Sequence, residues 1–203
     1  MSAVAAAPTA GQLIKPRAGR PEIVDVPEFN FVMVDGQGDP NTSHEFQDAI
    51  GALYALSYGA KFALKKAGFE FRVMPLEALW WSNRPRDFWR ADRDRWQWTA
   101  MILQPDPVTA GVVEAVRAEA MRKKPNPALG RVRFQAFREG RCAQVMHVGP
   151  YSAEQPTIEL LHAFIAAEGY KPAGKHHEIY LGDPRRAAPE KLRTVIRQPI
   201  DRA

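Results

Sequence analysis

The stretch QVMHVG, residues 144–149, repeats the pattern of FVMVDG, residues 31–36, and this repeat decides the fold. Each stretch is a mostly apolar run that ends in glycine, which is typical of a strand closed by a turn. Two further pairs of stretches follow in the same order. They are PLEALWW (75–81) with HHEIYLG (176–182), and TAMILQP (99–105) with LRTVIRQP (192–199). Three pairs in one order predict two copies of one structural plan.

A long helix is predicted between the first and second stretch of each copy. In the first copy, Thr42 and Glu45 have the spacing of a capping box, and apolar residues at helical spacing continue until Gly68. In the second copy, the helix follows Pro156 and ends at Gly169. The expected fold class is therefore α+β, a tandem pair of β-α-β-β modules.

The two modules are expected at about residues 28–105 and 130–200, related by a pseudo-twofold axis. A central ligand cleft is expected between them, because small molecules usually bind in such clefts. A further helix is predicted over residues 109–124, and residues 131–149 are predicted to form two strands with Gly140 at the turn.

The composition indicates a soluble globular protein. The chain has 203 residues, of which 45% are hydrophobic and 25% charged, enough for one sizeable core over residues 22–203. Residues 1–21 are rich in alanine and proline and are predicted to be a disordered tail. No apolar run approaches the roughly 20 residues that span a bilayer. Cys142 is the only cysteine, which excludes an intrachain disulfide and favours a reducing, cytoplasmic location.

The net charge of +5 and the isoelectric point near 9.5 raise the question of nucleic-acid binding. The basic residues between 84 and 95 alternate with aspartates, and those at 122–124 end a predicted helix, where the helix dipole favours them. No standard nucleic-acid-binding motif is present. The charge therefore predicts a solvated surface and no direct contact with nucleic acid.

Glu178 is the first candidate site residue, because it is a carboxylate inside a predicted strand. Strand alternation puts it on one face with His176 and Tyr180. One interpretation is a ligand contact or a catalytic group. The alternative is a hydrogen-bonded pair with His176 or with an arginine across an exposed face of the sheet.

Tryptophans form the second candidate group, since all five lie between residues 80 and 98. Alternation puts Glu77 and Trp81 on one face of their strand, and the repeat gives Glu77 the place of Glu178. Trp98 lies on one face of the next strand. A ligand cavity walled by rings is one interpretation of Trp81 and Trp98, and core packing is the other.

The loop HVGPYSAEQPT, residues 147–157, follows a predicted strand. The glycine and proline at 149 and 150 make a sharp turn, so Tyr151 is expected to project from the strand end at the rim of the cleft. Glu154 precedes a predicted helix. Glu154 could cap this helix or could face the ligand, and the capping role is favoured, because the helix dipole stabilises a negative charge there.

Several other sites are excluded by the residues present. DGQGDPN lacks the third glycine of a dinucleotide-binding loop. His176 and His177 point to opposite faces of a strand, so they cannot bind one metal ion together. No Gly-x-Ser-x-Gly motif indicates a serine hydrolase.

Five motifs together resemble the GyrI-like small-molecule-binding superfamily, and within it the stand-alone subfamily that includes cyclopropanoid cyclopropyl hydrolases. The similarity runs from about residue 22 to the C-terminus. The motifs are HVGPY, HHEIYLGDPRR, APEKLRTVIRQP, PLEALWW and WQWTAMILQPDPVT.

The resemblance implies tandem SHS2-type modules and a cleft for planar hydrophobic or cationic small molecules. In the subfamily, an aromatic cage holds DNA-alkylating agents of the yatakemycin and duocarmycin type, whose strained cyclopropane is opened by water. The matching cage positions are Trp81, Trp98, Tyr151 and Tyr180, with Glu178 as the acidic group. Further ligand contacts are expected from Trp80, Glu77 and His176.

For a hydrolase, we expect Glu178 to orient and deprotonate the attacking water, and Tyr180 or Tyr151 to donate to the developing phenolate. No cofactor or metal is required by this scheme. The alternatives are a non-catalytic binder, acting as a drug sink or sensor, and a gyrase-inhibitor-like interaction protein. A monomer and a homodimer are both compatible with the sequence, and no membrane partner is expected.

Overall fold

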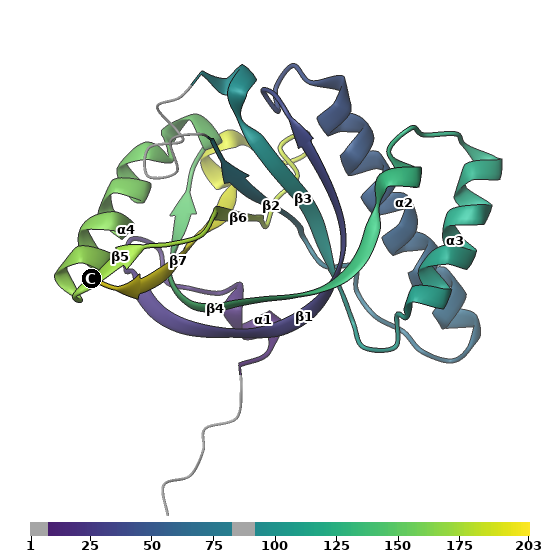
Figure 1. The fold of residues 1–203 in the computed structure, drawn as a ribbon, viewed down its shortest axis with the longest axis horizontal. Coiled ribbons are helices and arrows are strands. Elements are labelled where there is room, and N and C mark those ends of the chain that lie inside the picture. Colours follow the sequence, from purple (N-terminus) through teal and green to yellow (C-terminus); the bar gives the residue numbers. More distant parts are fainter. Residues whose placement is uncertain (1–7, 83–91) are drawn as a thin grey trace, which may run out of the picture. The chain divides into compact units, whose positions relative to one another are not determined.

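The computed structural model describes residues 8–82 and 92–203, and the chain divides into two compact units (Figure 1). We call Phe29–Phe137 the central unit, and Met1–Glu28 with Arg138–Ala203 the terminal unit. The boundaries fall within the long strands β1 (Glu22–Gln37) and β4 (Arg133–Val148). The predicted first module is thus shorter than the central unit, because the chain beyond residue 105 packs onto the same unit.

The described residues of the central unit include an antiparallel sheet and two long helices. β3 (Gln97–Gln104) lies between β1 and β2 (Leu76–Trp81). The helices α2 (His44–Lys66) and α3 (Ala110–Lys123) lie side by side (Figure 1). In the part of the chain that the structure describes, no helix combines the length and apolar character needed to cross a membrane.

The start of α2 lies one residue later than the predicted capping box. The N-cap is Ser43, not Thr42, and its hydroxyl oxygen accepts a hydrogen bond from the backbone N–H of Phe46 at 3.2 Å. The helix ends just before Gly68, as predicted, where a φ of 87° favours glycine. A side chain therefore caps this helix in the ordinary way.

The tryptophan of β3 forms the centre of the core in this unit. Trp98 is fully buried and packs edge-on against Phe46, with ring centroids 5.0 Å apart. Gly36 on β1 allows this packing, because a Cβ atom at that position would lie 2.2 Å from the indole ring.

The terminal unit also has a strand followed by a helix and further strands. β4 is followed by α4 (Gln155–Ala167), β5 (Tyr170–Pro172), β6 (His176–Tyr180) and β7 (Arg193–Arg202). β7 pairs with β4 on one side and with β6 and β5 on the other, all antiparallel. As in the central unit, the last strand lies between the first strand and the one that follows the helix.

The register of the two sheets gives the position of each predicted glutamate. Glu77 on β2 lies opposite Met101, two residues after Thr99, and Glu178 on β6 lies opposite Ile196, two residues after Thr194. The equivalence of the two glutamates stays a prediction from the sequence repeat. The pseudo-twofold axis that the sequence suggested stays a prediction.

Two predicted features differ in the terminal unit. β4 runs unbroken through Gly140, which adopts a φ of 78° inside the strand instead of forming a hairpin turn. The N-terminal segment, predicted to be disordered over residues 1–21, contains the short helix α1 (Ala10–Leu13), while residues 1–7 lie outside the description. The side chain of Leu13 is buried, and this burial orders the segment.

A buried polar network joins that segment to the sheet. Arg197 on β7 donates to the carboxylate of Glu139 at 3.0 Å and to the carbonyl oxygen of Leu13 at 3.1 Å. His177 lies 3.0 Å from the same carboxylate. Burial opposes ionisation of Glu139, but the charges and hydrogen bonds of His177 and Arg197 outweigh it and lower its pKa to about 2. The network is therefore an ionised cluster inside the terminal unit.

Candidate functional site

The predicted face of β6 brings three polar side chains together. The Tyr180 hydroxyl donates a hydrogen bond to Oε2 of Glu178 at 2.7 Å, and Nε2 of His176 lies 3.2 Å from Oε1. Strand alternation alone predicted this grouping, because residues two apart share a face. Both oxygens of the Glu178 carboxylate are therefore held by neighbours on its own strand.

This face is largely shielded from solvent. The side chain of Glu178 is 13% exposed and that of His176 is 1% exposed. The predicted pair of Glu178 with His176 is present, but it does not lie on an exposed face, where such pairs are ordinarily found. A shielded carboxylate with two fixed neighbours is a group whose orientation is defined before a ligand arrives.

Tyr151 contacts the same group from the segment between β4 and α4. It lies in the short helical turn Tyr151–Ala153 and packs edge-on against Tyr180, with ring centroids 5.4 Å apart and an interplanar angle of 70°. The structure thus places Tyr151, Tyr180, Glu178 and His176 together, as the sequence predicted. Two aromatic rings with different orientations lie beside one carboxylate.

The loop that carries Tyr151 is held by the histidine of HVGPY. Nδ1 of His147 lies 2.9 Å from the hydroxyl of Thr157, and Nε2 lies 3.3 Å from the carbonyl oxygen of Pro150. Gly149 has a φ of 138°, and its N–H donates to the carbonyl oxygen of Leu192 at 3.0 Å. These contacts fix both ends of the segment between β4 and α4.

Glu154 has a different role from the predicted one. It occupies the N-cap position of α4, but its side chain makes no capping hydrogen bond, and the residue is only 5% exposed. Burial and the nearby charge of Glu178 raise the pKa of Glu154 well above its ordinary value, and the Thr194 hydroxyl offsets only part of this. The capping role is therefore wrong, and Glu154 belongs to the group around Glu178.

A signal for this position was present in the sequence. The preferred N-cap residues are serine, threonine, aspartate and asparagine, whose short side chains reach the helix N–H groups. Glutamate is not among them. A glutamate at the expected helix start, next to a proline, was therefore a poor candidate for capping from the beginning.

Tryptophans of the central unit do not all share one face. Residues that lie opposite each other in an antiparallel pair point to the same side, and Trp80 lies opposite Trp98, whereas Trp81 lies opposite Gln97. Trp80 and Trp98 both contact Phe46 of α2 in the core. Trp98 therefore does not share a face with Trp81, and the ligand contacts expected of Trp80 and Trp98 stay predictions. Glu77 and Trp81 do share a face, and their ligand contact stays a prediction.

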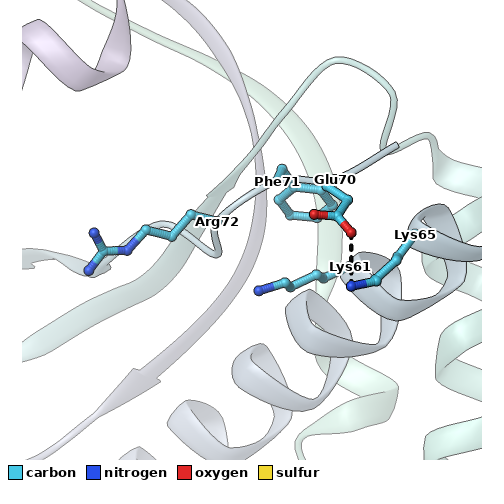
Figure 2. Close-up of a pocket in the computed structure, with 5 residues that line it drawn as sticks. All are labelled: Lys61, Lys65, Glu70, Phe71 and Arg72. Atoms are coloured by element: carbon cyan, nitrogen blue, oxygen red, sulfur yellow. Dashed lines mark ion pairs between the residues drawn. The ribbon is translucent and has the colours of Figure 1, made fainter. Parts of the chain in front are cut away.

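A pocket of about 370 Å³ lies elsewhere in the central unit and has a different character. Figure 2 shows its lining, two lysines from the end of α2 and three residues that follow the helix. Lys65 forms an ion pair with Glu70 at 2.8 Å, and Arg72 extends away from this pair (Figure 2). The lining residues are Lys61, Lys65, Glu70, Phe71 and Arg72. None of the predicted site residues lines this pocket.

The histidine and acidic side chains were also compared with the groupings that bind metal ions in proteins. Within residues 8–82 and 92–203, no three histidine, cysteine, aspartate or glutamate side chains are arranged to hold a metal ion. His176 and His177 face opposite sides of β6 and contact different glutamates, Glu178 and Glu139.

Comparison with known proteins identifies the fold that carries this site. Residues 20–201 match the GyrI-like small molecule binding domain. The chain belongs to this family. The expectation from the five motifs is thereby confirmed at the level of the family, and the GyrI-like domain spans both units.

Solved structures from Listeria innocua are similar to this GyrI-like chain along almost its whole length. A hydrolase is 42% identical, with a TM-score of 0.82 and coverage of 94% of this chain and 96% of its own. An uncharacterized conserved protein is also 42% identical, with a TM-score of 0.87 and coverage of 95% and 97%. No curated protein gives a significant match.

A more distant solved structure shows similarity of the fold alone. The C-terminal domain of EcmrR is 11% identical, with a TM-score of 0.56, and the match covers 91% of this chain and 98% of that domain. The two chains thus share a fold although few of their residues are identical.

Proposed function

We propose that this GyrI-like protein is a hydrolase that opens the strained cyclopropane of DNA-alkylating xenobiotics, of the yatakemycin and duocarmycin type, by adding water. A relative of known structure that is 42% identical is described as a hydrolase, which supports the reaction class. The five motifs support the narrower subfamily. The role in the cell would be detoxification, and drug resistance would follow from it.

The observation that carries the proposal is the geometry around Glu178. Its carboxylate is shielded, and its oxygens contact the Tyr180 hydroxyl and the His176 ring. A general base must have a fixed orientation toward the proton it removes. A binder of flat hydrophobic compounds needs no such fixed carboxylate, whereas a binder of cationic compounds would pair the carboxylate with its ligand, and product formation separates that binder from the hydrolase.

The reaction is an addition of water across a carbon–carbon bond. Such a cyclopropane is conjugated to a dienone. Glu178 would take a proton from water as the oxygen attacks the CH₂ carbon, the ring bond breaks, and its electron pair moves to the dienone oxygen, which becomes a phenolate. Besides the substrate, this scheme uses only side chains of the protein and a water molecule.

The aromatic residues would bind the planar ligand and keep other nucleophiles away. Tyr151 and Tyr180 lie edge to face, which leaves ring surface for stacking. The hydroxyl proton of Tyr180 is directed at Glu178, so Tyr180 is better suited to orient the base than to donate to the phenolate. Trp81 and Glu77 are proposed as additional ligand contacts.

The test is mass-resolved product analysis after incubation with a cyclopropane-bearing duocarmycin-type compound. We expect a ring-opened product that has gained one water, and its loss in Glu178→Gln. The matched control is Glu168→Gln, which makes the same chemical change at an exposed position and should leave turnover unchanged. Tight binding of the compound without any product would contradict the hydrolase and indicate a drug sink or a sensor.

A further inference from the structure

The proposed reaction needs a group that protonates the dienone oxygen, a role for which the sequence suggested Tyr180 or Tyr151. Negative charge develops there as the ring opens, and a positioned acid would stabilise it. We infer that Glu154 is this acid: its carboxyl group donates a proton to the dienone oxygen while Glu178 accepts one from water. The inference rests on the proposed function, and it adds a second catalytic carboxyl group to the same site.

The local structure of the helix start explains why the Glu154 side chain is available. An N-cap side chain ordinarily accepts hydrogen bonds from the first N–H groups of a helix. In α4 the second residue is Pro156, which has no N–H. The N–H groups of Thr157 and Ile158 donate to the backbone carbonyl of Glu154, at 2.9 and 3.0 Å. The helix therefore begins without using this carboxyl group.

Glu154 is buried three residues after Tyr151, whose ring packs against Tyr180, the residue that donates to Glu178. The residue is 5% exposed, and among the described residues its Oε1 atom has no hydrogen-bond partner. Thr194 on β7 lies beside it, and the charge that acts on it comes from Glu178 on β6. A buried carboxyl oxygen without a partner is costly, and such groups mark sites where a ligand supplies the missing contact.

Two carboxyl groups in unlike surroundings divide into an acid and a base. Glu178 accepts a hydrogen bond from Tyr180 and contacts His176, whereas Glu154 has a buried oxygen with no such partner. When two carboxyl groups lie close together, one of them retains its proton, because both charges cannot be buried side by side. The raised pKa of Glu154 agrees with its being the protonated member at neutral pH.

The proton balance of this step closes within the site. Water loses a proton to Glu178 and its oxygen bonds to the CH₂ carbon, while the dienone oxygen gains the proton of Glu154. The product is a phenol that carries a hydroxymethyl group, formed from the CH₂ carbon and the oxygen of water. Glu178 is then protonated and Glu154 ionised, and proton exchange between the two groups, directly or through water, restores the starting state.

The experiment compares wild type, Glu154→Gln and the exposed control Glu168→Gln with one duocarmycin-type compound. Glutamine keeps the shape of the side chain but cannot transfer a proton. We expect turnover by Glu154→Gln to fall roughly 10²–10⁴-fold while the dissociation constant stays within a few-fold. Wild-type turnover should fall as pH rises through the raised pKa of Glu154, and this alkaline loss should be absent from the residual activity of Glu154→Gln.

Two further measurements keep the role of Glu154 separate from a structural one. Analogues whose ring-opened phenol is more acidic need less help from an acid, so the loss in Glu154→Gln should shrink with them. Infrared difference spectra at neutral pH should show a protonated carboxyl group in the wild type that Glu154→Gln lacks. This second readout does not depend on catalysis.

The outcomes separate this inference from the function beneath it. If the wild type forms no product, the proposed function is wrong, and the catalytic role of Glu154 falls with it. If the wild type forms product and Glu154→Gln does so at the same rate with the same pH profile, only the role of Glu154 is wrong. A missing carboxyl band in the wild type would also contradict it.

Discussion

The two helix starts, at Ser43 in the central unit and at Glu154 in the terminal unit, follow equivalent strands but differ in what the N-cap side chain does. Ser43 accepts the N–H of Phe46, whereas the Glu154 side chain makes no cap and lies buried. Because the Glu154 side chain does not cap the helix, its carboxyl group is available for the proposed proton transfer. Each of the two helices has an N-cap residue, and only that of α4 is an acid.

The strands β2 and β6 also differ in the residues that surround their glutamates. The sequence repeat gives Glu77 the place of Glu178, but the residues two positions away differ. Tyr180 and His176 flank Glu178, whereas Leu79 and Pro75 occupy those positions beside Glu77 and carry no side-chain donor. A carboxylate acquires a defined role from its neighbours, so the repeat predicts where a glutamate lies but not what it does.

The largest expected effect tests whether Trp98 of the central unit serves packing of the core while Tyr151 of the terminal unit serves ligand binding. Trp98→Ala should lower the free energy of unfolding by about 3–5 kcal/mol, because the indole fills the core beside Phe46. Tyr151→Ala should cost far less stability, because Tyr151 is only half-buried, but should weaken ligand binding. Chemical denaturation and ligand titration of both variants measure this, and equal losses of stability would remove the distinction.

A second prediction converts the surroundings of Glu178 toward those of Glu77. Tyr180→Leu introduces the residue found at position 79 and removes the hydrogen bond of 2.7 Å to Glu178. A hydrogen bond to a charged group contributes about 1.5–3 kcal/mol, so turnover should fall about 10–100-fold.

The variant Tyr180→Phe serves as the control for the ring. It keeps the packing against Tyr151 and removes only the hydroxyl. Steady-state kinetics should show that the two variants lose similar amounts of kcat. If Tyr180→Phe retained full activity, the ring would matter and the hydrogen bond would not.

The third prediction concerns pH and the buried acid. The folded state raises the pKa of Glu154 above that of the unfolded chain, so the folded state binds this proton more tightly. Stability is then fully present below the ordinary glutamate pKa and is lost as pH rises toward the raised value, by at most about 1.4 kcal/mol per pH unit. Thermal unfolding across this range should show a decline in the wild type that Glu154→Gln reduces. Parallel curves would contradict the assignment.

The smallest expected effect concerns the ordinary cap. Ser43→Ala should lower the free energy of unfolding by about 1 kcal/mol, because the N–H of Phe46 loses its acceptor. Ser43→Asp restores an acceptor and should recover most of that stability. Denaturant midpoints measure both variants, and a loss that aspartate does not repair would indicate that the hydroxyl acts through some other contact.

Sequence reasoning predicted the local parts of this site and missed those that depend on tertiary contacts. Alternation places Glu178 beside Tyr180 and His176 whatever the rest of the chain does. Whether Trp81 and Trp98 share a face depends on the register of β2 against β3, which a single strand does not encode. Glu154 looks like a helix-dipole partner locally, and only its burial beside Glu178 reveals the other role.

The boundaries of some secondary-structure elements also depend on tertiary contacts that the sequence does not reveal. The segment 131–149 was predicted to be a hairpin because Gly140 is a turn residue, but glycine also permits an irregular residue within one long strand. The N-terminal segment has the composition of a tail, yet it contributes Leu13 to the core. Composition does not reveal a single buried leucine that anchors a short segment.

That anchor matters for anyone who shortens the chain. The family match begins at residue 20, which invites a truncated version that starts there. Such a version would lack the carbonyl oxygen of Leu13 that accepts from Arg197, and one N–H of a guanidinium group buried in the sheet would lose its acceptor. The segment that contains α1 therefore belongs in an expressed version of the domain, although the family match begins after it.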